Sequence, residues 1–261
     1  MRVAPLEELF SLHNRVALVT GASGNIGAVL AKGLACAGAT MALHGRSVTK
    51  LSELKREIEE IGGTSDHFVA DLSLLENIPV LVEEVIARFG RIDILVNCAG
   101  MNQREPIVEV TPEVYEQIMA TNLRCVYFLS QAVLAQMIAQ GGGKVINIGS
   151  LTSSVGLANV SVYGMTKSAV AHLTKSMAIE WAQHNIQVNC LCPGFIATDL
   201  TMPLWEDPQK RRWILDRLPI QRPGTPEDLV GMAIYLASNA SSYMTGQTVY
   251  VDGGFLAGSE W

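Results

Sequence analysis

A tyrosine and a lysine stand four residues apart in this sequence, at Tyr163 and Lys167, so on a helix they lie one above the other. Ser150 precedes the tyrosine and closely follows an apolar run that is typical of a strand. Hydride transfer at a carbinol carbon needs such a set, because a proton must pass to or from the alcohol oxygen while a hydroxyl holds that oxygen in place. We predict that Tyr163 exchanges the proton, that Lys167 activates Tyr163 and that Ser150 positions the substrate.

The lysine matters because a free phenol is a poor base. Its pKa lies near ~10, and bringing it to about 7 takes roughly 4 kcal/mol. One cation about 4 Å away contributes about that much at an effective dielectric of about 20. An isolated Tyr-x-x-x-Lys spacing is also typical of an exposed tyrosine and a solvated lysine on a surface helix. A second motif is therefore needed to distinguish a catalytic pair from a surface pair.

A glycine-rich turn supplies that second motif. The first apolar run leads into Thr20–Gly27, and a helix rich in Ala and Leu follows. Glycines let a diphosphate approach the backbone, and the N–H groups of a helix N-terminus attract the anion. Its place between the first strand and first helix favours dinucleotide binding over a mere tight turn. The predicted contacts are Gly21, Ser23, Gly24, Asn25, Ile26 and Gly27.

The end of the second strand, His44-Gly45-Arg46, bears on the choice of cofactor. In dinucleotide folds an acidic side chain there holds the ribose hydroxyls of NAD(H), whereas arginine accommodates the 2′-phosphate of NADP(H). Arg46 therefore favours NADP(H), with NAD(H) as the alternative if Arg46 is only a solvated loop charge. Asp71 and Asn97–Gly100 follow later strands, where small residues leave room for adenine and ribose.

Short apolar runs alternate with longer segments of helical period along the whole chain. The runs are Val16–Val19, Thr40–Leu43, Phe68–Ala70, Ile92–Val96, Lys144–Ile148, Gln187–Leu191 and Thr248–Val251. Continuously apolar strands are covered on both faces, so the pattern predicts a doubly wound α/β fold: a seven-stranded parallel sheet of the Rossmann type with helices on both faces. We expect a single oxidoreductase domain over 1–261, with a lead-in over 1–14 and a substrate-binding segment over 199–219.

The composition excludes several classes of protein. Hydrophobic residues make up 49% and charged residues 17% of 261 residues, which excludes a disordered chain. The net charge of −6 argues against nucleic acid or an anionic membrane as partner, and no apolar stretch reaches the roughly 20 residues of a membrane span. Five cysteines and five histidines show no metal-ligand spacing, so no metal is expected. We interpret the cysteines as reduced, buried thiols of a cytoplasmic protein.

Taken together, these motifs resemble the short-chain dehydrogenase/reductase family from about Val16 to Gly254. The resemblance implies a Rossmann-type domain, a nicotinamide cofactor and a homotetramer or homodimer. The usual middle glycine of the family's turn is Asn25 here, with Gly24 one place earlier. The implied catalytic tetrad is Asn122, Ser150, Tyr163 and Lys167, in which Asn122 would hold a water that links the lysine to solvent.

The family's other motifs imply further cofactor contacts. The Asn-Asn-Ala-Gly segment appears as Asn97–Gly100 with cysteine second, and Pro193–Thr198 resembles the nicotinamide segment. Val251–Gly254 resembles a C-terminal signature associated with subunit packing. Besides the glycine-rich turn and Arg46, the implied contacts are Asp71, Leu72, Asn97, Ala99, Gly100, Tyr163, Lys167, Pro193, Gly194, Ile196 and Thr198.

Within the family, the chain is most similar to sugar-acid dehydrogenases of the gluconate 5-dehydrogenase and 2-deoxy-3-ketogluconate dehydrogenase type. Phe10–Leu12, Ile148–Ser153, Glu180–Gln183 and Ser241–Gly246 carry this similarity. It implies hydride transfer between nicotinamide and a carbonyl or secondary alcohol, with a keto sugar acid such as 5-ketogluconate as substrate. Ser150, Tyr163 and Arg104 would contact that substrate. A guanidinium can bind a carboxylate through two hydrogen bonds, unless Arg104 instead pairs with Glu105 or solvent.

Two other functions stay open. A 3-oxoacyl thioester reductase, or a general carbonyl or ketone reductase, would use the same tetrad and differ in Thr201–Pro219. Leu204, Trp205 and Trp213 in that segment could close over an apolar substrate as well as over a sugar. A non-catalytic nicotinamide-binding regulator would keep the glycine-rich turn and usually lose the tyrosine or the lysine, both of which are present.

Overall fold

The expected strands join one parallel sheet in the order β3-β2-β1-β4-β5-β6-β7. The computed structural model describes residues 4–258. β1 and β4 are buried at every residue, as parallel strands covered on both faces must be. The predicted doubly wound, seven-stranded fold is confirmed. The strands are β1 (Val16–Val19), β2 (Thr40–Gly45), β3 (Ser65–Val69), β4 (Ile94–Asn97), β5 (Gly143–Ile148), β6 (Ile186–Pro193) and β7 (Thr248–Val251).

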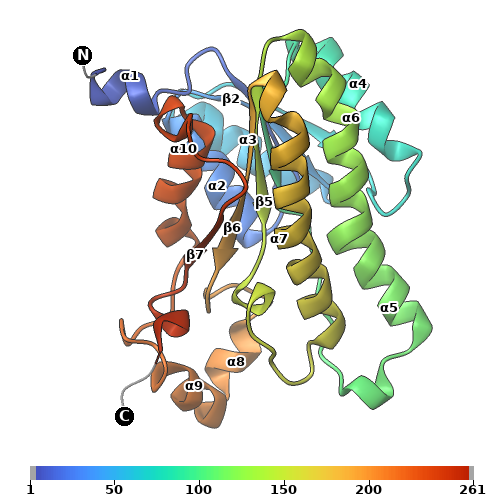
Figure 1. The fold of residues 1–261 in the computed structure, drawn as a ribbon, viewed down its shortest axis with the longest axis vertical. Helices are drawn as coiled ribbons and strands as arrows, with labels where there is room; N and C mark the ends of the chain where they lie inside the picture. The colour runs from blue at the N-terminus through green and yellow to red at the C-terminus, as the bar shows by residue number, and fades with distance from the viewer. Residues whose placement is uncertain (1–3, 259–261) are drawn as a thin grey trace.

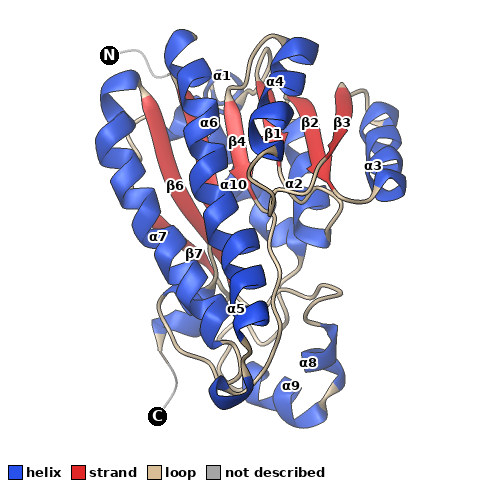
Figure 2. Ribbon diagram, turned by 90° about the vertical axis from the view of Figure 1, so that its right-hand side faces the viewer, coloured by secondary structure: helices blue, strands red, loops and turns tan. Residues whose placement is uncertain are grey.

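Helices cover both faces of the sheet, each with its own apolar cluster (Figure 2). One layer contains α2 (Asn25–Cys36), α3 (Val48–Glu60) and α10 (Val230–Ala237). The other contains α4 (Asn77–Phe89), α6 (Cys125–Ala139) and α7 (Ser161–Trp181). The remaining helices are α1 (Leu6–Phe10), α5 (Pro112–Met119), α8 (Met202–Glu206) and α9 (Pro208–Leu215). In the lead-in, α1 lies beside α10 (Figure 1). The two helices pack through Phe10 and Tyr235, whose ring centroids are 6.4 Å apart.

The strand order reverses at the centre of the sheet. β1 pairs with β2 on one side and with β4 on the other, so the chain builds outward to β3 and then returns. The loops that leave the carboxyl ends of β1 and β4 therefore diverge, and in such folds ligands bind in the crevice between them. Most of the predicted site residues line a cleft at this crevice; they come from the loops that follow the strands and from α7.

We expected no apolar stretch of the length of a membrane span. The helical segment Pro112–Ala139 corrects this expectation, because by length and composition alone it is apolar enough to span a membrane. Its inner side chains, including Val126, Leu129 and Val133, instead belong to the apolar cluster between the sheet and the layer of α4, α6 and α7. A π-helical turn, η2 (Ala120–Arg124), joins its halves α5 and α6. Such turns are frequent at functional sites.

The cysteines are free but not uniformly buried. Cys125, Cys190 and Cys192 are buried, whereas Cys36 is exposed and Cys98 is half-buried. The prediction of five buried thiols was wrong for these two. Cys36 ends α2, and the cleft described below opens at Cys98.

Lys144, near the start of β5, makes stability depend on pH. Its Nζ donates to Ser241 Oγ at 3.2 Å, and burial together with the charge of Arg15 lowers its pKa from 10.5 to about 8. The unfolded chain thus binds more protons between these two values, so Lys144 makes the free energy of unfolding rise as pH increases from about 8 to 10.5.

Urea denaturation of the wild type and Lys144→Met, compared across that pH range, checks this expectation. Taking the difference between the two proteins removes the contribution of other titrating groups. That difference should be constant below about pH 8 and should shift in favour of the wild type above it. A difference that does not change with pH would contradict the prediction.

Candidate active site

The glycine-rich turn packs directly against the end of β4. Gly21 has a φ of +67°, and a Cβ atom on it would lie 2.8 Å from Ala99 Cα. Thr20 Oγ1 accepts hydrogen bonds from the backbone N–H groups of Cys98 and Ala99, both at 3.0 Å. A side chain at position 21 would adopt a disfavoured conformation and push two backbone segments apart, so glycine is required there.

The same turn forms a cradle at the start of α2. A Cβ atom on Gly27 would lie 2.3 Å from the Gly21 carbonyl oxygen, whereas one on Gly24 would lie 3.4 Å from that atom. Gly24 is the N-cap of α2, and no side chain in the described part of the chain caps this N-terminus. The N–H groups of its first turn are therefore available to an anion. The cradle fits the diphosphate of a dinucleotide.

Asn25 replaces the family's middle glycine without disturbing the start of the helix. It is the first residue of α2, and its Nδ2 donates to Asp199 Oδ1 at 3.4 Å. The substitution therefore connects the glycine-rich turn to the segment that follows β6.

The end of β2 brings a cation to the rim of the site. Arg46 is exposed and lines the cleft. Hydrogen bonds from Ser73 lower the pKa of Asp71, and the charge of Arg46 adds to that effect, so these two charges face the same region. His44 is buried, and burial lowers its pKa to about 4 while its Nε2 lies 3.1 Å from the Ala70 carbonyl oxygen. At neutral pH the histidine is therefore uncharged.

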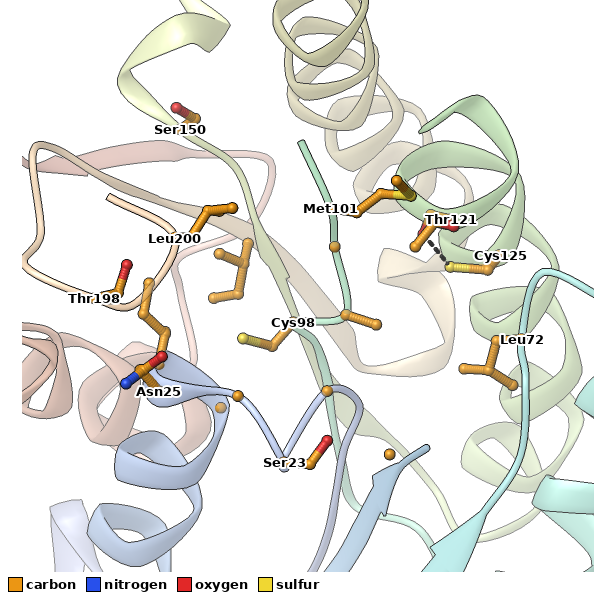
Figure 3. A pocket seen from close by; sticks show the side chains of 18 of the residues that line it. Ser23, Asn25, Leu72, Cys98, Met101, Thr121, Cys125, Ser150, Thr198 and Leu200 are labelled. Atoms are coloured by element: carbon orange, nitrogen blue, oxygen red, sulfur yellow. Dashed lines mark hydrogen bonds between the residues drawn. The ribbon is translucent and has the colours of Figure 1, made fainter. Parts of the chain in front are cut away.

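These segments enclose a cleft of about 450 Å³ at the carboxyl ends of the strands. In Figure 3 the turn with Ser23 and Asn25 lies below, Thr198 stands on one side, and Leu72 and Cys125 stand on the other. Most of the predicted site residues line this one cleft. They are Gly21, Ser23, Gly24, Asn25, Ile26, Gly27, Arg46, Asp71, Leu72, Ala99, Gly100, Ser150, Tyr163, Lys167, Pro193, Gly194, Ile196 and Thr198.

Several lining residues were not predicted. Gln117 and Thr121 look like ordinary helix positions in the sequence, and only the fold brings the end of α5 over the cleft. Cys98 carried a usable signal, since it stands between two predicted contacts. The others are His44, Gly45, Ala70, Ser73, Met101, Cys125, Ile148 and Gly149, whereas Leu200 and Thr201 belong to the predicted substrate-binding segment over 199–219.

Asn97 does not line the cleft, although it was predicted to contact cofactor. Its side chain is buried, and its Nδ2 donates to Ser130 Oγ at 2.9 Å and to Asn147 Oδ1 at 2.8 Å. In a parallel strand alternate side chains point to opposite faces, and that of Asn97 points toward α6. Asn97 therefore joins β4 to β5 and α6, and it supports the end of β4 without lining the cleft.

Asn122 lies in the π-helical turn and is fully buried. Its amide pairs with the backbone of Met101: Oδ1 accepts from the Met101 N–H and Nδ2 donates to the Met101 carbonyl, both at 2.8 Å. A Cβ atom on Gly100 would lie 3.5 Å from Asn122 Oδ1 and 3.8 Å from Lys167 Nζ. The asparagine and the lysine therefore approach the same point beside the end of β4.

Lys167, Tyr163 and Ser150 all line the cleft. Lys167 is 5% exposed; its Nζ donates to the Ile148 carbonyl at 2.7 Å and lies 5.6 Å from the centroid of the Tyr163 ring. Ser150 is 8% exposed, and its Oγ accepts from the Thr152 N–H at 3.1 Å. Within residues 4–258 the Ser150 hydroxyl has no acceptor, so its proton is free to be donated. The site thus places a hydroxyl, a phenol and an ammonium group in a dinucleotide cleft.

Arg104 lies close to this group without lining the cleft. The residue is exposed; partial burial lowers the pKa of its guanidinium, and the nearby Tyr163 raises it. The loop that carries it is held by the Glu105 N–H, which donates to the Asn159 carbonyl at 3.0 Å. This bond joins the loop after β4 to the loop before α7.

The segment over 199–219 forms α8 and α9, which extend beyond the strands beside the C-terminal turn (Figure 1). Ile214 and Leu218 are buried in a small cluster with Leu151 and Phe195. Trp205 packs edge-to-face on Phe195, with ring centroids 6.4 Å apart. The segment therefore presents an apolar inner face to the loop that follows Ser150.

Comparison with known proteins identifies the family. A family model described as enoyl-(acyl carrier protein) reductase matches residues 21–256. The chain belongs to the short-chain dehydrogenase/reductase family. This family member is therefore a dehydrogenase that acts on CH–OH groups with NAD(P).

Similar family members extend over nearly the whole chain. The 2-dehydro-3-deoxy-D-gluconate 5-dehydrogenase of Escherichia coli K12 is 43% identical, covering 95% of this chain and 98% of that protein. Gluconate 5-dehydrogenase of Gluconobacter oxydans 621H is 41% identical, with coverage of 95% and 96%. The crystal structure of gluconate 5-dehydrogenase from Burkholderia cenocepacia J2315, in complex with NADP and tartrate, is 40% identical with a TM-score of 0.94, covering 97% and 100%.

Proposed function

We propose that this enzyme transfers a hydride between NADP(H) and a sugar acid, interconverting a keto acid such as 5-ketogluconate and its secondary alcohol. The observation that carries the proposal is that Ser150, Tyr163 and Lys167 line the same cleft as the glycine-rich turn, with Lys167 Nζ 5.6 Å from the centroid of the Tyr163 ring. The names of the similar dehydrogenases support the sugar-acid part.

The chain's own residues bind and orient the cofactor in this proposal. NADP(H), when bound, donates or accepts the hydride. The N–H groups at the start of α2 hold its diphosphate, Asp71 and Leu72 lie at the adenine end, and Arg46 holds the 2′-phosphate. Ile196 and Thr198, at the opposite wall of the cleft, hold the carboxamide of the nicotinamide.

The tetrad handles the substrate oxygen and its proton. Ser150 donates a hydrogen bond to that oxygen, because the Thr152 N–H already occupies a lone pair of its Oγ and orients the hydroxyl. Tyr163 passes a proton to the oxygen when a carbonyl is reduced and takes it back when an alcohol is oxidised. The Lys167 ammonium, held at the Ile148 carbonyl, stabilises negative charge on the phenol. Asn122 holds a water that connects the lysine to solvent.

Replacing Arg46 with alanine should weaken NADPH binding by about tenfold or more, because a charge-assisted hydrogen bond contributes about 1.5–3 kcal/mol. NADH lacks the 2′-phosphate, so its dissociation constant should change little. Fluorescence titration with both cofactors checks this selectivity. Lys50→Ala is a suitable control, since Lys50 is an exposed cation on α3 outside the cleft. Equal weakening of both cofactors would show that the 2′-phosphate is not bound at Arg46.

The substrate is proposed from Arg104. Its guanidinium, close to Tyr163, suits a substrate carboxylate. A spectrophotometric screen of NADPH and NADH against keto sugar acids, 3-oxoacyl thioesters and small diketones tests this. We expect turnover with keto sugar acids and a large rise in KM, at similar kcat, for the matching uncharged keto sugars. Turnover of apolar ketones alone would exclude the sugar-acid proposal.

A second candidate function is reduction of a 3-oxoacyl thioester or another apolar ketone. The apolar inner face of the 199–219 segment, with Trp205 against Phe195, favours it. The same screen separates the two functions, because the thioester and the sugar acid differ in both charge and polarity.

We also propose that residues 1–261 act as one catalytic unit in a cytoplasmic homotetramer or homodimer. Exposed apolar side chains on α6 and α7 support association: Tyr127 is 46% exposed, Phe128 is 38% exposed and Ile179 is 81% exposed. Reduced cysteines fit the cytoplasm, where disulfides are rare. Sedimentation at several protein concentrations tests the assembly.

A further inference from the structure

Ser153 lies outside the tetrad, yet its hydroxyl contacts the backbone of two tetrad members. Its Oγ accepts a hydrogen bond from the Ser150 N–H at 3.3 Å and donates one to the Lys167 carbonyl at 2.9 Å. We propose that Ser153 is a positioning residue, which holds Ser150 in register with Lys167 during catalysis. The proposal rests on the proposed function of the tetrad.

The Ser153 hydroxyl closes a ring of hydrogen bonds around Ser150. Lys167 Nζ donates to the Ile148 carbonyl at 2.7 Å, before Ser150, while the Lys167 carbonyl accepts from Ser153, after it. The same lysine is therefore tied to the chain on both sides of the catalytic serine. If the Ser153 hydroxyl is removed, its hydrogen bond to the Lys167 carbonyl is lost. Ser150 can then shift relative to the Lys167 ammonium group.

Tight packing on the amino-terminal side of Ser150 leaves the hydrogen bonds of Ser153 to restrain the other side. A Cβ atom on Gly149 would lie 2.4 Å from Cys192 Sγ and 3.2 Å from Ser153 Oγ. Cys192 is fully buried, and its Sγ lies 3.8 Å from Ser153 Oγ. The backbone before Ser150 cannot move toward β6, so the remaining freedom is along the 3₁₀ helix η3 (Leu151–Ser153), which the Ser153 hydroxyl restrains.

The hydroxyl completes a capping box with Ser150 at the start of η3, but it is not needed for α7. Lys167 lies inside α7, where its carbonyl accepts from the backbone N–H four residues later. A carbonyl has two lone pairs, so Ser153 uses the second one and its loss leaves the helical ladder intact. We therefore expect the loss of the hydroxyl to affect turnover more than stability.

Ser153→Ala should lower kcat by about ten- to a hundredfold, because a displacement of about 1 Å at a catalytic group has an effect of this size. KM and the dissociation constant for NADPH should be unchanged. Ser153→Thr keeps the hydroxyl and should restore kcat. If the added methyl group lowers Tm and the variant fails to fold, the comparison with the control below decides instead.

Ser168→Ala is the matched control. Ser168 Oγ also joins α7 to η3, donating to the Thr152 and Ser153 carbonyls at 3.4 and 3.3 Å, but its described bonds reach neither Ser150 nor Lys167. A purely structural role for Ser153 predicts that both alanine variants lose Tm and keep kcat. A positioning role for Ser153 predicts that kcat falls in Ser153→Ala and stays at the wild-type value in Ser168→Ala.

Hydrogen exchange gives a readout that does not depend on turnover. The Ser150 N–H loses its acceptor in Ser153→Ala, so its exchange should become faster there and stay unchanged in Ser168→Ala. Unchanged exchange at Ser150, or wild-type kcat in Ser153→Ala, would overturn the proposal. If the wild type reduces another carbonyl compound but no keto sugar acid, the substrate proposal fails, and the variants are compared on the compound that reacts.

Discussion

Replacing Tyr163 with phenylalanine is expected to remove nearly all turnover while leaving cofactor binding intact. The change deletes only the phenolic O–H, the group proposed to exchange a proton with the substrate oxygen. A positioned acid or base contributes about 10²–10⁴-fold, so kcat should fall by about three orders of magnitude. The Lys167 ammonium keeps its bond to the Ile148 carbonyl, and the cleft keeps its shape. Steady-state kinetics and fluorescence titration with NADPH measure the two effects separately.

Tyr243→Phe provides the control for Tyr163→Phe. Tyr243 is 104% exposed and does not line the cleft, so the same atom is removed without a catalytic consequence. A Tyr163→Phe enzyme that keeps more than about a tenth of the wild-type kcat would exclude Tyr163 as the proton-exchanging group. A variant that fails to bind NADPH would instead indicate a role in holding the cofactor.

Gly27→Ala is expected to have the largest effect on cofactor affinity. The new Cβ would lie 2.3 Å from the Gly21 carbonyl oxygen, so the turn and the start of α2 must move apart. The N–H groups proposed to bind the diphosphate move with them. Losing one or two charge-assisted hydrogen bonds of about 1.5–3 kcal/mol each weakens binding by about a hundredfold or more. NADPH and NADH should be affected alike, because both carry the diphosphate.

The neighbouring glycine offers a sharp control for this effect. Gly24 has an extended backbone with φ −101° and ψ 161°, and a Cβ atom on it would lie 3.4 Å from the Gly21 carbonyl oxygen. Gly24→Ala should therefore bind NADPH far better than Gly27→Ala. Wild-type affinity in Gly27→Ala would contradict a cradle at the start of α2. Calorimetric titration and the Tm of each variant distinguish lost binding from lost folding.

The strands were predictable because their signals are local, but several of their ends were not. The interpretation of Val16–Val19 as a strand matches β1 residue for residue, since a short apolar run followed by a glycine turn defines both ends. The second strand extends from the predicted Thr40–Leu43 to Gly45, and the third begins at Ser65 instead of Phe68. Those ends are set by pairing, as Gly45 pairs with Val69 and Met41 with Ser65.

The sequence by itself determined the parallel sheet, the glycine-rich turn and the spacing of Tyr163 and Lys167, because each depends on residues that are neighbours along the chain. Only the tertiary structure decided that Asn97 supports the site from beneath and that Ser153 joins Ser150 to Lys167. These contacts join segments on different strands and helices. Which segments meet depends on how the two helical layers pack on the sheet, and no local pattern encodes that.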